Sequence, residues 1–244
     1  MICKNELNKE PVESFPYKPP SLEVYNTFSY LFHIKHPLPT RYSKLAFDKI
    51  MSIFFIALST PIFLLLKVAF FIEGLLIPEN KGPMFYYYNC VSAGKVVPKY
   101  KIRIIKTKFI DVVAARSNDW IAYSAEWRPE ARTYLGHFVK KFYLDELPQF
   151  WSVLKGDMSI VGPRPLSVLH YKRDLEQGNI TRYLLRGGLL GLGHINKGTS
   201  EMGNPIHEYS YAHEYLNRTG FRLLCLDLSI ILKGFLLIVR GGGH

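Results

Sequence analysis

A long apolar run extends from Ile50 to Ile72, and only Lys67 and Pro61 interrupt it. Its length exceeds the roughly 20 residues that a helix needs to cross a bilayer. The segment before it is polar and proline-rich, and it lacks the order of basic, apolar and small residues that marks a cleaved signal peptide. We therefore expect the run to be retained as a membrane helix.

Pro61 predicts a bend in this helix. A proline removes a backbone donor and clashes with the preceding turn, and the hydroxyls of Ser59 and Thr60 are suited to bond the carbonyls that it frees. Both flanks are basic, with Arg41, Lys44 and Lys49 before the run and Lys81, Lys95, Lys99, Lys101 and Arg103 after it. Because positive charge marks the cytoplasmic side, these flanks favour a re-entrant helix that turns at Thr60 and Pro61 and leaves by the same face. A kinked transmembrane helix is the alternative.

The overall charge limits the partners of the chain. It has 31 Lys and Arg residues against 20 Asp and Glu, a formal net charge of +11, which attracts nucleic acid, nucleotides or anionic lipid. Because 48% of the residues are hydrophobic and 14% aromatic, a membrane surface is favoured and no nucleic-acid partner is expected. Cys3, Cys90 and Cys225 lie far apart, so we expect neither a disulfide framework nor a cysteine metal site, and a reducing compartment follows.

Composition divides the chain into three parts. Residues 1–40 hold scattered prolines and predict an irregular N-terminal extension, with a short helix between Leu22 and Ile34. Residues 41–80 form the expected re-entrant membrane helix, and residues 81–244 form a domain on the cytoplasmic face. This monotopic arrangement leaves membrane lipid as an expected partner, and a homodimer is also allowed.

The part after residue 80 combines strands and helices. A small β-hairpin is expected around residues 92–94, and residues 111–132 indicate a mobile loop or short helices. Apolar periodicity predicts helices at 135–155 and 221–239. Charges in the second of these favour an interfacial or buried position over a spanning one. The expected fold is thus α+β and helix-rich, with interfacial amphipathic helices.

Charged and bulky residues alternate from Lys99 to Arg103. Because side chains alternate between the faces of a strand, this pattern places Lys99, Lys101 and Arg103 on one face. Two interpretations stay open. The face either binds phosphate or is an exposed basic edge that discourages aggregation.

Asp145 and Glu146 stand just before Pro148 in the sequence Leu144-Asp145-Glu146-Leu147-Pro148. Acids in the first turn of a helix are favoured by its dipole, which is reason enough for their presence. They also permit chemistry, because adjacent helical side chains point about 100° apart. One carboxylate is then placed to bind a divalent metal or attack phosphorus while the other handles a proton.

Arg164 stands between Pro163 and Pro165 in a turn that begins at Gly162. The two prolines fix the backbone on either side of the guanidinium. A guanidinium restrained in this way is suited to a phosphate, because its fork matches two oxygens and little freedom is lost on binding. The turn therefore predicts an anion-binding position shortly after the acid pair.

These residues carry a family resemblance. The stretch from Leu144 to Pro165 resembles the signature of bacterial monotopic phosphoglycosyl transferases, and a looser similarity extends from about Arg41 to Arg240, including Lys81-Gly82-Pro83 and Asp227-Leu228. The resemblance implies that residues 81–244 are catalytic and lie at the cytoplasmic face of the bacterial inner membrane. It also implies transfer of a phosphosugar from a UDP-sugar to polyprenyl (undecaprenyl) phosphate, with release of UMP, at the start of glycan assembly.

The resemblance assigns roles to individual positions. Asp145 would attack the β-phosphate and contact Mg²⁺, while Glu146 would assist with the proton or the metal. The cations implied at the phosphates and nucleotide are Lys101, Arg103, Lys140, Arg164 with its neighbours Pro163 and Pro165, and Arg186. A bound metal and cations are what a carboxylate needs before it can approach a phosphate.

Several positions depart from the family pattern on the side that would hold the UDP-sugar. Lys140 replaces an arginine, Cys90-Val91-Ser92 replaces Arg-x-Gly, and His194 replaces a glutamine. A loop that is usually Arg-Pro-Gly-Ile-Thr-Gly runs here from Arg186 to Gly191. We expect these changes to affect which sugar is transferred rather than the type of reaction.

Two other functions remain as hypotheses. A membrane-associated glycosyltransferase that acts on a hydroxyl would also use a UDP-sugar, although its frequent Asp-x-Asp triplet is absent from this sequence. A non-catalytic membrane anchor would explain the charge and the apolar helices but not the acid pair with Arg164.

Overall fold

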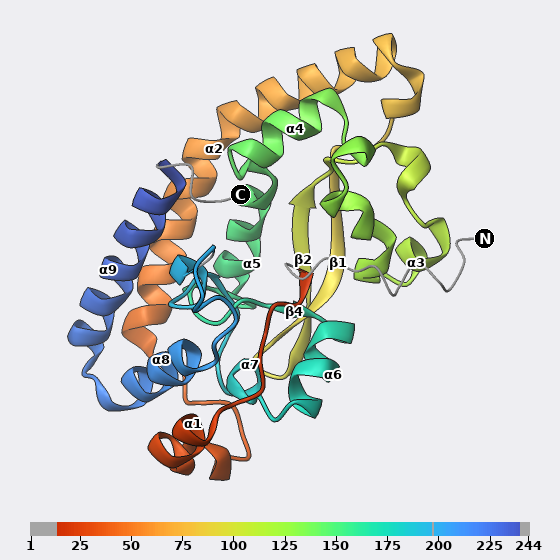
Figure 1. The fold of residues 1–244 in the computed structure, drawn as a ribbon. Coiled ribbons are helices and arrows are strands. Elements are labelled where there is room, and N and C mark those ends of the chain that lie inside the picture. Colours follow the sequence, from red (N-terminus) through yellow and green to blue (C-terminus); the bar gives the residue numbers. More distant parts are fainter. Residues whose placement is uncertain (1–13, 197, 240–244) are drawn as a thin grey trace.

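A computed structural model of the protein describes residues 14–196 and 198–239 (Figure 1). The α-helices are α1 (Leu22–Thr27), α2 (Tyr42–Leu76), α3 (Val112–Arg116), α4 (Tyr134–Lys141), α5 (Phe150–Lys155), α6 (Val168–Glu176), α7 (Thr181–Leu184), α8 (Ile206–Asn217) and α9 (Gly220–Val239). The 3₁₀ helices are η3 (Ser29–His33), η4 (Pro78–Asn80), η5 (Thr107–Phe109), η6 (Trp120–Trp127), η7 (Pro129–Ala131), η8 (Leu144–Gln149) and η9 (His194–Asn196). The strands are β1 (Phe85–Ser92), β2 (Lys95–Ile102), β3 (Ser159–Val161), β4 (Leu166–Ser167) and β5 (Gly188–Leu190). The predicted helix-rich α+β class is confirmed.

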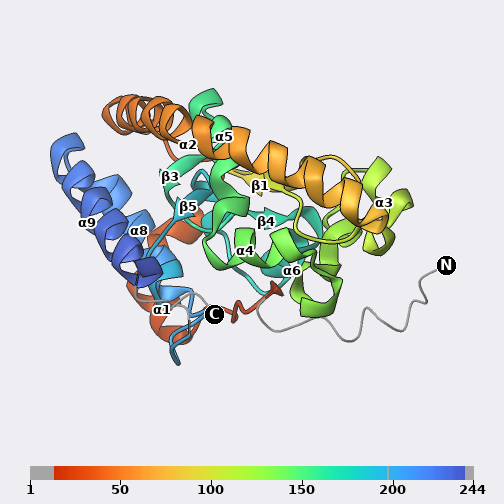
Figure 2. The ribbon, with the colours of Figure 1, turned by 90° about the horizontal axis from the view of Figure 1, so that it is seen from above.

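Helix α2 is unbroken over 35 residues and contains Pro61. It runs along one side of the domain, with α9 beside its first part (Figures 1 and 2). Within the described residues it is long and apolar enough to cross a membrane, and only 17% of its most apolar window is buried. Ser59 and Thr60 donate hydrogen bonds to the carbonyls of Phe55 and Ile56, whereas the carbonyl that Pro61 leaves without a donor is that of Ala57. The two hydroxyls thus bond carbonyls in the adjacent turn and do not replace the hydrogen bond that the Ala57 carbonyl lacks.

The predicted hairpin is present. Strands β1 and β2 pair antiparallel from Phe85 opposite Ile102 to Ser92 opposite Lys95. Ala93 and Gly94 form the two-residue turn, both with positive φ, 49° and 71°, as a tight hairpin turn requires. Strand β4 completes the sheet order β2-β1-β4.

A second, parallel pair joins β3 to β5, with Ser159 opposite Gly188. The two chains approach so closely that a Cβ added to Gly188 would lie 2.1 Å from the backbone nitrogen of Gly162. Only glycine fits such a contact. This pairing places the Pro163-Arg164-Pro165 turn, which follows β3, beside the residues that follow Arg186.

The N-terminal segment packs into the domain. The short helix expected between Leu22 and Ile34 is present as α1 and η3, and Val24 and Leu31 are fully buried in the same apolar cluster as Met158. Residues 111–132 form short helices, which is the second of the two alternatives predicted for them. Of these, η6 buries Trp120 in a second apolar cluster behind the hairpin.

Helix α9 buries one side and exposes the other. Leu223, Asp227 and Ile230 are buried, and the Asp227 carboxylate accepts a hydrogen bond from Lys44 of α2 at 2.7 Å. The outer side nevertheless carries large exposed apolar residues, which are Phe221, Leu228, Leu232, Phe235 and Leu236. Together with α2 it gives one edge of the molecule an apolar surface.

Candidate active site

Asp145 and Glu146 lie in the first turn of η8, which leads directly into α5. The residue before η8, Tyr143, is unusual because it is a non-glycine residue with a left-handed backbone at φ 55°. Such conformations cost of order 1–3 kcal/mol and gather at functional sites. Asp145 is fully buried, whereas the Glu146 side chain is 25% exposed.

Two lysines from different elements hold one oxygen of Asp145. The Nζ of Lys101 on β2 lies 3.2 Å from Oδ2, and the Nζ of Lys140 on α4 lies 3.4 Å from the same oxygen. The other oxygen, Oδ1, is buried and has no hydrogen-bond partner among the residues that the structure describes. Since a buried polar atom normally has a partner, this carboxylate oxygen is a candidate contact for a ligand.

Glu126 of η6 is a further member of the site that the sequence did not reveal. Its Oε2 accepts a hydrogen bond from Lys101 at 2.6 Å, and both side chains are nearly fully buried. Burial alone would raise the pKa of Glu126, but Lys101, and then Lys140, lower it to about 2. Lys101 is thus held between two carboxylates. Burial alone would lower the pKa of Lys101, but the negative charges of Glu126 and Asp145 raise it well above the ordinary value.

Glu146 belongs to the same group of charges. Its Oε1 lies 3.9 Å from Nη2 of Arg164. Burial opposes ionisation, yet Lys99 and then Arg164 hold the pKa of Glu146 well below its usual range. Lys99 is itself buried, and that burial, partly offset by Glu146, lowers its pKa to about 8.

The turn around Arg164 is fixed by neighbours as well as by its prolines. The Pro163 carbonyl accepts a hydrogen bond from the Gly188 N–H at 2.8 Å, and the Arg164 carbonyl accepts one from Nε of Arg182 at 2.9 Å. A Cβ added to Gly187 would lie 2.7 Å from the Cβ of Pro165. The Arg164 side chain as a whole is 36% exposed, so it remains available to a ligand.

The structure therefore gathers five predicted residues into one group, namely Lys101, Lys140, Asp145, Glu146 and Arg164. Arg103 is used differently. It follows the last residue of β2, and Nε, Nη1 and Nη2 donate to the carbonyls of Pro83, Ile105 and Asn80, respectively. Its donors are directed at the backbone, so we leave Arg103 out of the site.

Arg186 is also placed elsewhere. Its Nη2 lies 3.8 Å from Asp48 of α2 and has no hydrogen-bond partner within the described part of the chain. It lines a cavity of about 420 Å³, whose other cationic residues are Lys44, Lys49, Lys95 and Lys155 and whose lining does not include Asp145. The unpartnered carboxylate oxygen belongs to Asp145, in the group of paired charges, and not to this cavity. We therefore place the candidate active site at Asp145.

His194 lies near this group at the start of η9. Burial, and then the positive charge of Arg164, lower its pKa to about 3. The imidazole is therefore neutral at physiological pH. A neutral imidazole both donates and accepts a hydrogen bond, as the glutamine side chain of the resembled family does.

The acid pair fits a magnesium ion that arrives with its substrate. No group of three or more His, Cys, Asp or Glu side chains suited to a metal occurs in the described part of the chain. Mg²⁺ is commonly bound through one or two carboxylates together with substrate phosphates rather than by a cage of protein ligands. Asp145, with its unpartnered Oδ1, and the ionised Glu146 beside it meet that requirement.

Comparison with known proteins identifies the family. The protein-family model described as bacterial sugar transferase matches residues 39–241, and the chain belongs to that family. It is 30% identical over 261 residues to the undecaprenyl-phosphate galactose phosphotransferase of Salmonella typhimurium, covering 98% of this chain and 52% of that protein. It is 32% identical over 201 residues to the UDP-glucose:undecaprenyl-phosphate glucose-1-phosphate transferase of Klebsiella pneumoniae, covering 80% and 39% of the two chains. The chain thus spans about half the length, or less, of these relatives.

Proposed function

We propose that this chain transfers a phosphosugar from a UDP-sugar to polyprenyl phosphate, releases UMP and begins the assembly of a glycan. The observation that carries the proposal is the buried Asp145 carboxylate, whose Oδ2 is held by Lys101 and Lys140 while Oδ1 has no partner in residues 14–196 and 198–239. The names of the Salmonella and Klebsiella relatives specify the same class of acceptor.

The reaction proceeds in two steps. Oδ1 of Asp145 attacks the β-phosphorus of the UDP-sugar, a bond from carboxylate oxygen to phosphorus forms, and the bond from phosphorus to the bridging oxygen breaks to release UMP. A phosphate oxygen of the lipid then attacks the same phosphorus and frees the carboxylate. Both leaving and attacking groups are anions, so neither step requires a general acid. This ordering makes the covalent phosphosugar on Asp145 the intermediate.

The surrounding cations offset the negative charge that gathers during both steps. Lys101 and Lys140 orient Asp145, and the partly exposed Arg164 side chain is available to the phosphate oxygens. Mg²⁺ held by Asp145, together with the diphosphate, would supply further charge neutralisation. Because its pKa is lowered, Glu146 stays ionised, which favours a role toward the metal and Arg164 over proton donation.

We propose that the protein lies on the cytoplasmic face of the bacterial inner membrane in a monotopic arrangement, with α2 entering and leaving by the same face. The exposed apolar surfaces of α2 and α9 support membrane contact. The break in hydrogen bonding at Pro61 supports a bend, and the basic flanks support a common face for both ends. Membrane lipid is then a direct partner.

The sugar is set by residues on the donor side. Of the departures from the family pattern, Cys90 is fully buried in β1, and the Ser92 hydroxyl donates to the Asp157 carbonyl and accepts from the Gly187 N–H, so both serve the framework. Lys140 contacts Asp145 but keeps the positive charge of the arginine that it replaces, whereas His194 lies with Arg164 and Glu146 and changes the chemistry of its position. We therefore assign His194 to sugar or nucleotide discrimination.

The experiment that tests this function measures nucleotide release. Purified protein in detergent, with Mg²⁺, polyprenyl phosphate and a panel of UDP-sugars, is expected to release UMP. Release of UDP would instead indicate transfer of the sugar alone to a hydroxyl, and release of neither nucleotide with any sugar would indicate an anchor.

A further inference from the structure

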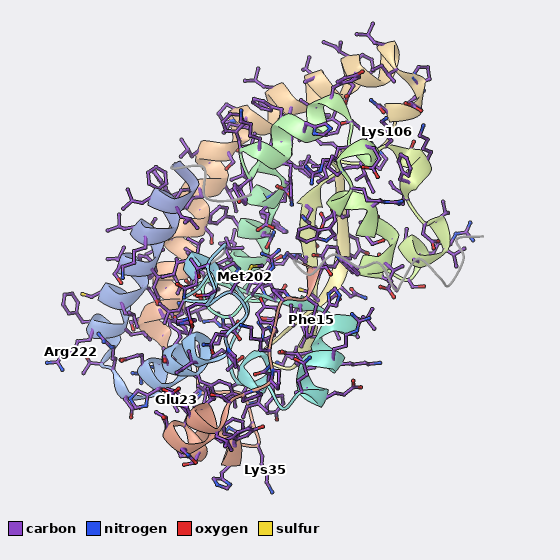
Figure 3. The ribbon with its side chains drawn as sticks, in the orientation of Figure 1. Phe15, Glu23, Lys35, Lys106, Met202 and Arg222 are labelled. Atoms are coloured by element: carbon purple, nitrogen blue, oxygen red, sulfur yellow. The ribbon has the colours of Figure 1, made fainter. Side chains whose placement is uncertain are left out.

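The segment that precedes the match to the family model packs against residues that support the active site. The match to the family model begins at residue 39, although the Salmonella relative aligns with 98% of the chain. Residues 14–20 cross the domain in front of the sheet, where Figure 3 labels Phe15. The Lys18 N–H donates to the Gly203 carbonyl at 3.0 Å, and Nδ2 of Asn179 donates to the Lys18 carbonyl at 2.9 Å. The Phe15 ring stacks on His170 with 5.4 Å between centroids.

Between these anchors, Tyr17 lies on a buried arginine. The guanidinium carbon of Arg182 is 4.0 Å from the centroid of the Tyr17 ring, and the Arg182 side chain is 1% exposed. Its nitrogens are all engaged, since Nη1 donates to Asp174 at 2.7 Å and Nη2 to Glu208 at 2.6 Å. The tyrosine ring covers a face of this planar group.

The third donor of Arg182 reaches the active site. Nε donates to the Arg164 carbonyl at 2.9 Å, and Arg164 in turn faces Glu146. The contacts therefore run from Tyr17 through Arg182 to the backbone of Arg164. They connect a segment that precedes the match to the family model to a residue that we place at the phosphates.

We propose that Tyr17 is a positioning residue. Its ring shields the Arg182 guanidinium from water and holds it in the orientation that bonds the Arg164 carbonyl, which fixes Arg164 beside the acid pair. This inference rests on the proposed function for the role of Arg164. The physical reason is that hydrogen bonds to a charged group weaken when water can compete for its donors, and that a cation on an aromatic face is attracted to the ring. Without the ring, the bond to the Arg164 carbonyl is exposed to that competition.

Three single variants of the full chain test the proposal. Tyr17→Leu removes the ring, Tyr17→Phe keeps it, and Tyr30→Leu is the control. Tyr30 belongs to the same N-terminal segment, is 39% exposed and contacts His213 rather than the site. All three are compared with the wild type for melting temperature, for the rate of UMP release and for amide hydrogen exchange of the peptide that covers residues 160–168.

For Tyr17→Leu we expect kcat/KM for the UDP-sugar to fall about tenfold, an effect between those of exposed and fully desolvated cation–π contacts. Exchange in residues 160–168 rises, and the melting temperature stays near that of Tyr30→Leu. Tyr17→Phe restores both kinetics and exchange to within about twofold of the wild type.

The proposal is overturned if Tyr17→Leu leaves exchange of residues 160–168 unchanged, or if Tyr17→Phe is as impaired as Tyr17→Leu. It is also overturned if Tyr30→Leu produces the same losses, because the effect then belongs to the whole segment. The exchange measurement needs no substrate. A chain that releases no UMP would contradict the proposed function, while exchange would still decide whether Tyr17 fixes the Arg164 turn.

Discussion

The Nζ of Lys101 lies 3.2 Å from Oδ2 of Asp145, and the two side chains are 2% and 0% exposed. A strand residue and a residue 44 positions later thus form a buried ion pair within the proposed site. Because Lys101 also bonds Glu126 at 2.6 Å, one ammonium compensates two carboxylates in a dry environment. Removing it leaves both acids buried with less positive charge nearby.

Lys101→Met is therefore expected to abolish UMP release and to lower the free energy of unfolding by about 3 kcal/mol, the usual cost of breaking a buried pair. The measurements are nucleotide release and chemical unfolding in detergent. Lys108→Met is the matched control, because its partner Glu79 is 42% exposed and Lys108 itself 53%. Exposed pairs contribute at most about 1 kcal/mol. Equal stability of the two variants would refute the importance of the Lys101 pair.

Asp145→Asn is expected to eliminate turnover while membrane association is kept. The amide has the same shape as the carboxylate but cannot displace UMP, and the apolar surfaces of α2 and α9 are unchanged. Intact mass of wild-type protein incubated with a UDP-sugar and no lipid should increase by one phosphosugar, and that of Asp145→Asn should not. Glu130→Gln, at an exposed position, should behave as the wild type. A normal rate for Asp145→Asn would disprove the nucleophile.

The lowered pKa of Lys99 predicts an alkaline limit to activity. Burial, opposed by Glu146, lowers this pKa to about 8. Lys99 loses its charge as the pH rises through this value, so less positive charge remains at the phosphates and kcat/KM falls. Stability changes in the opposite direction. Between about pH 8 and the unfolded lysine value of about 10.4, the unfolded chain binds more protons, and the folded state gains stability from this group.

The Lys99→Met variant tests this assignment through its pH profile. We expect kcat/KM of the variant to be lower than that of the wild type at pH 7. We also expect the alkaline decline of the wild type between pH 7.5 and about 9 to be absent from the variant. If the variant keeps the same alkaline decline as the wild type, another group causes it.

The sequence predicted the parts of the site that depend on local order. The acid pair, the restrained Arg164 and the tight hairpin each follow from neighbouring residues, so their spacing was sufficient. The strand pattern placed Lys99 and Lys101 on one face correctly. The same alternation was extended to Arg103, but β2 ends at Ile102, and beyond that residue the two-residue periodicity no longer fixes the direction of a side chain.

The remainder depends on contacts between distant segments. Glu126 enters the site only because η6 packs behind the hairpin, and no local pattern distinguishes it from other acids. Arg186 pairs with Asp48 because β5 lies beside β3 near the beginning of α2. The contact of Tyr17 with Arg182 could not be predicted either, because it depends on the path of an irregular segment. Such placements are set by tertiary packing.

The path of α2 through the membrane gives the last prediction. Tyr42 and Leu76, at the two ends of the helix, are 82% and 76% exposed, and Leu64 near the middle is 62% exposed. Single-cysteine variants at these positions can be labelled in inside-out and right-side-out vesicles with a charged maleimide. Cys3 and Cys225 are first replaced by serine, while Cys90 can stay because burial raises the pKa of its thiol to about 12 and leaves it unreactive.

A re-entrant helix that bends at Pro61 predicts that Tyr42→Cys and Leu76→Cys both react when the reagent reaches the cytoplasmic face. Leu64→Cys should be protected from both sides, because it lies just past the bend in the apolar layer. A straight span places the two ends on opposite faces, and labelling of only one end from each side would establish it. Replacing Pro61 by alanine removes the interruption in backbone bonding. If the bend depends on that proline, Leu76→Cys in the Pro61→Ala background should become less accessible from the cytoplasmic face while Tyr42→Cys is unaffected.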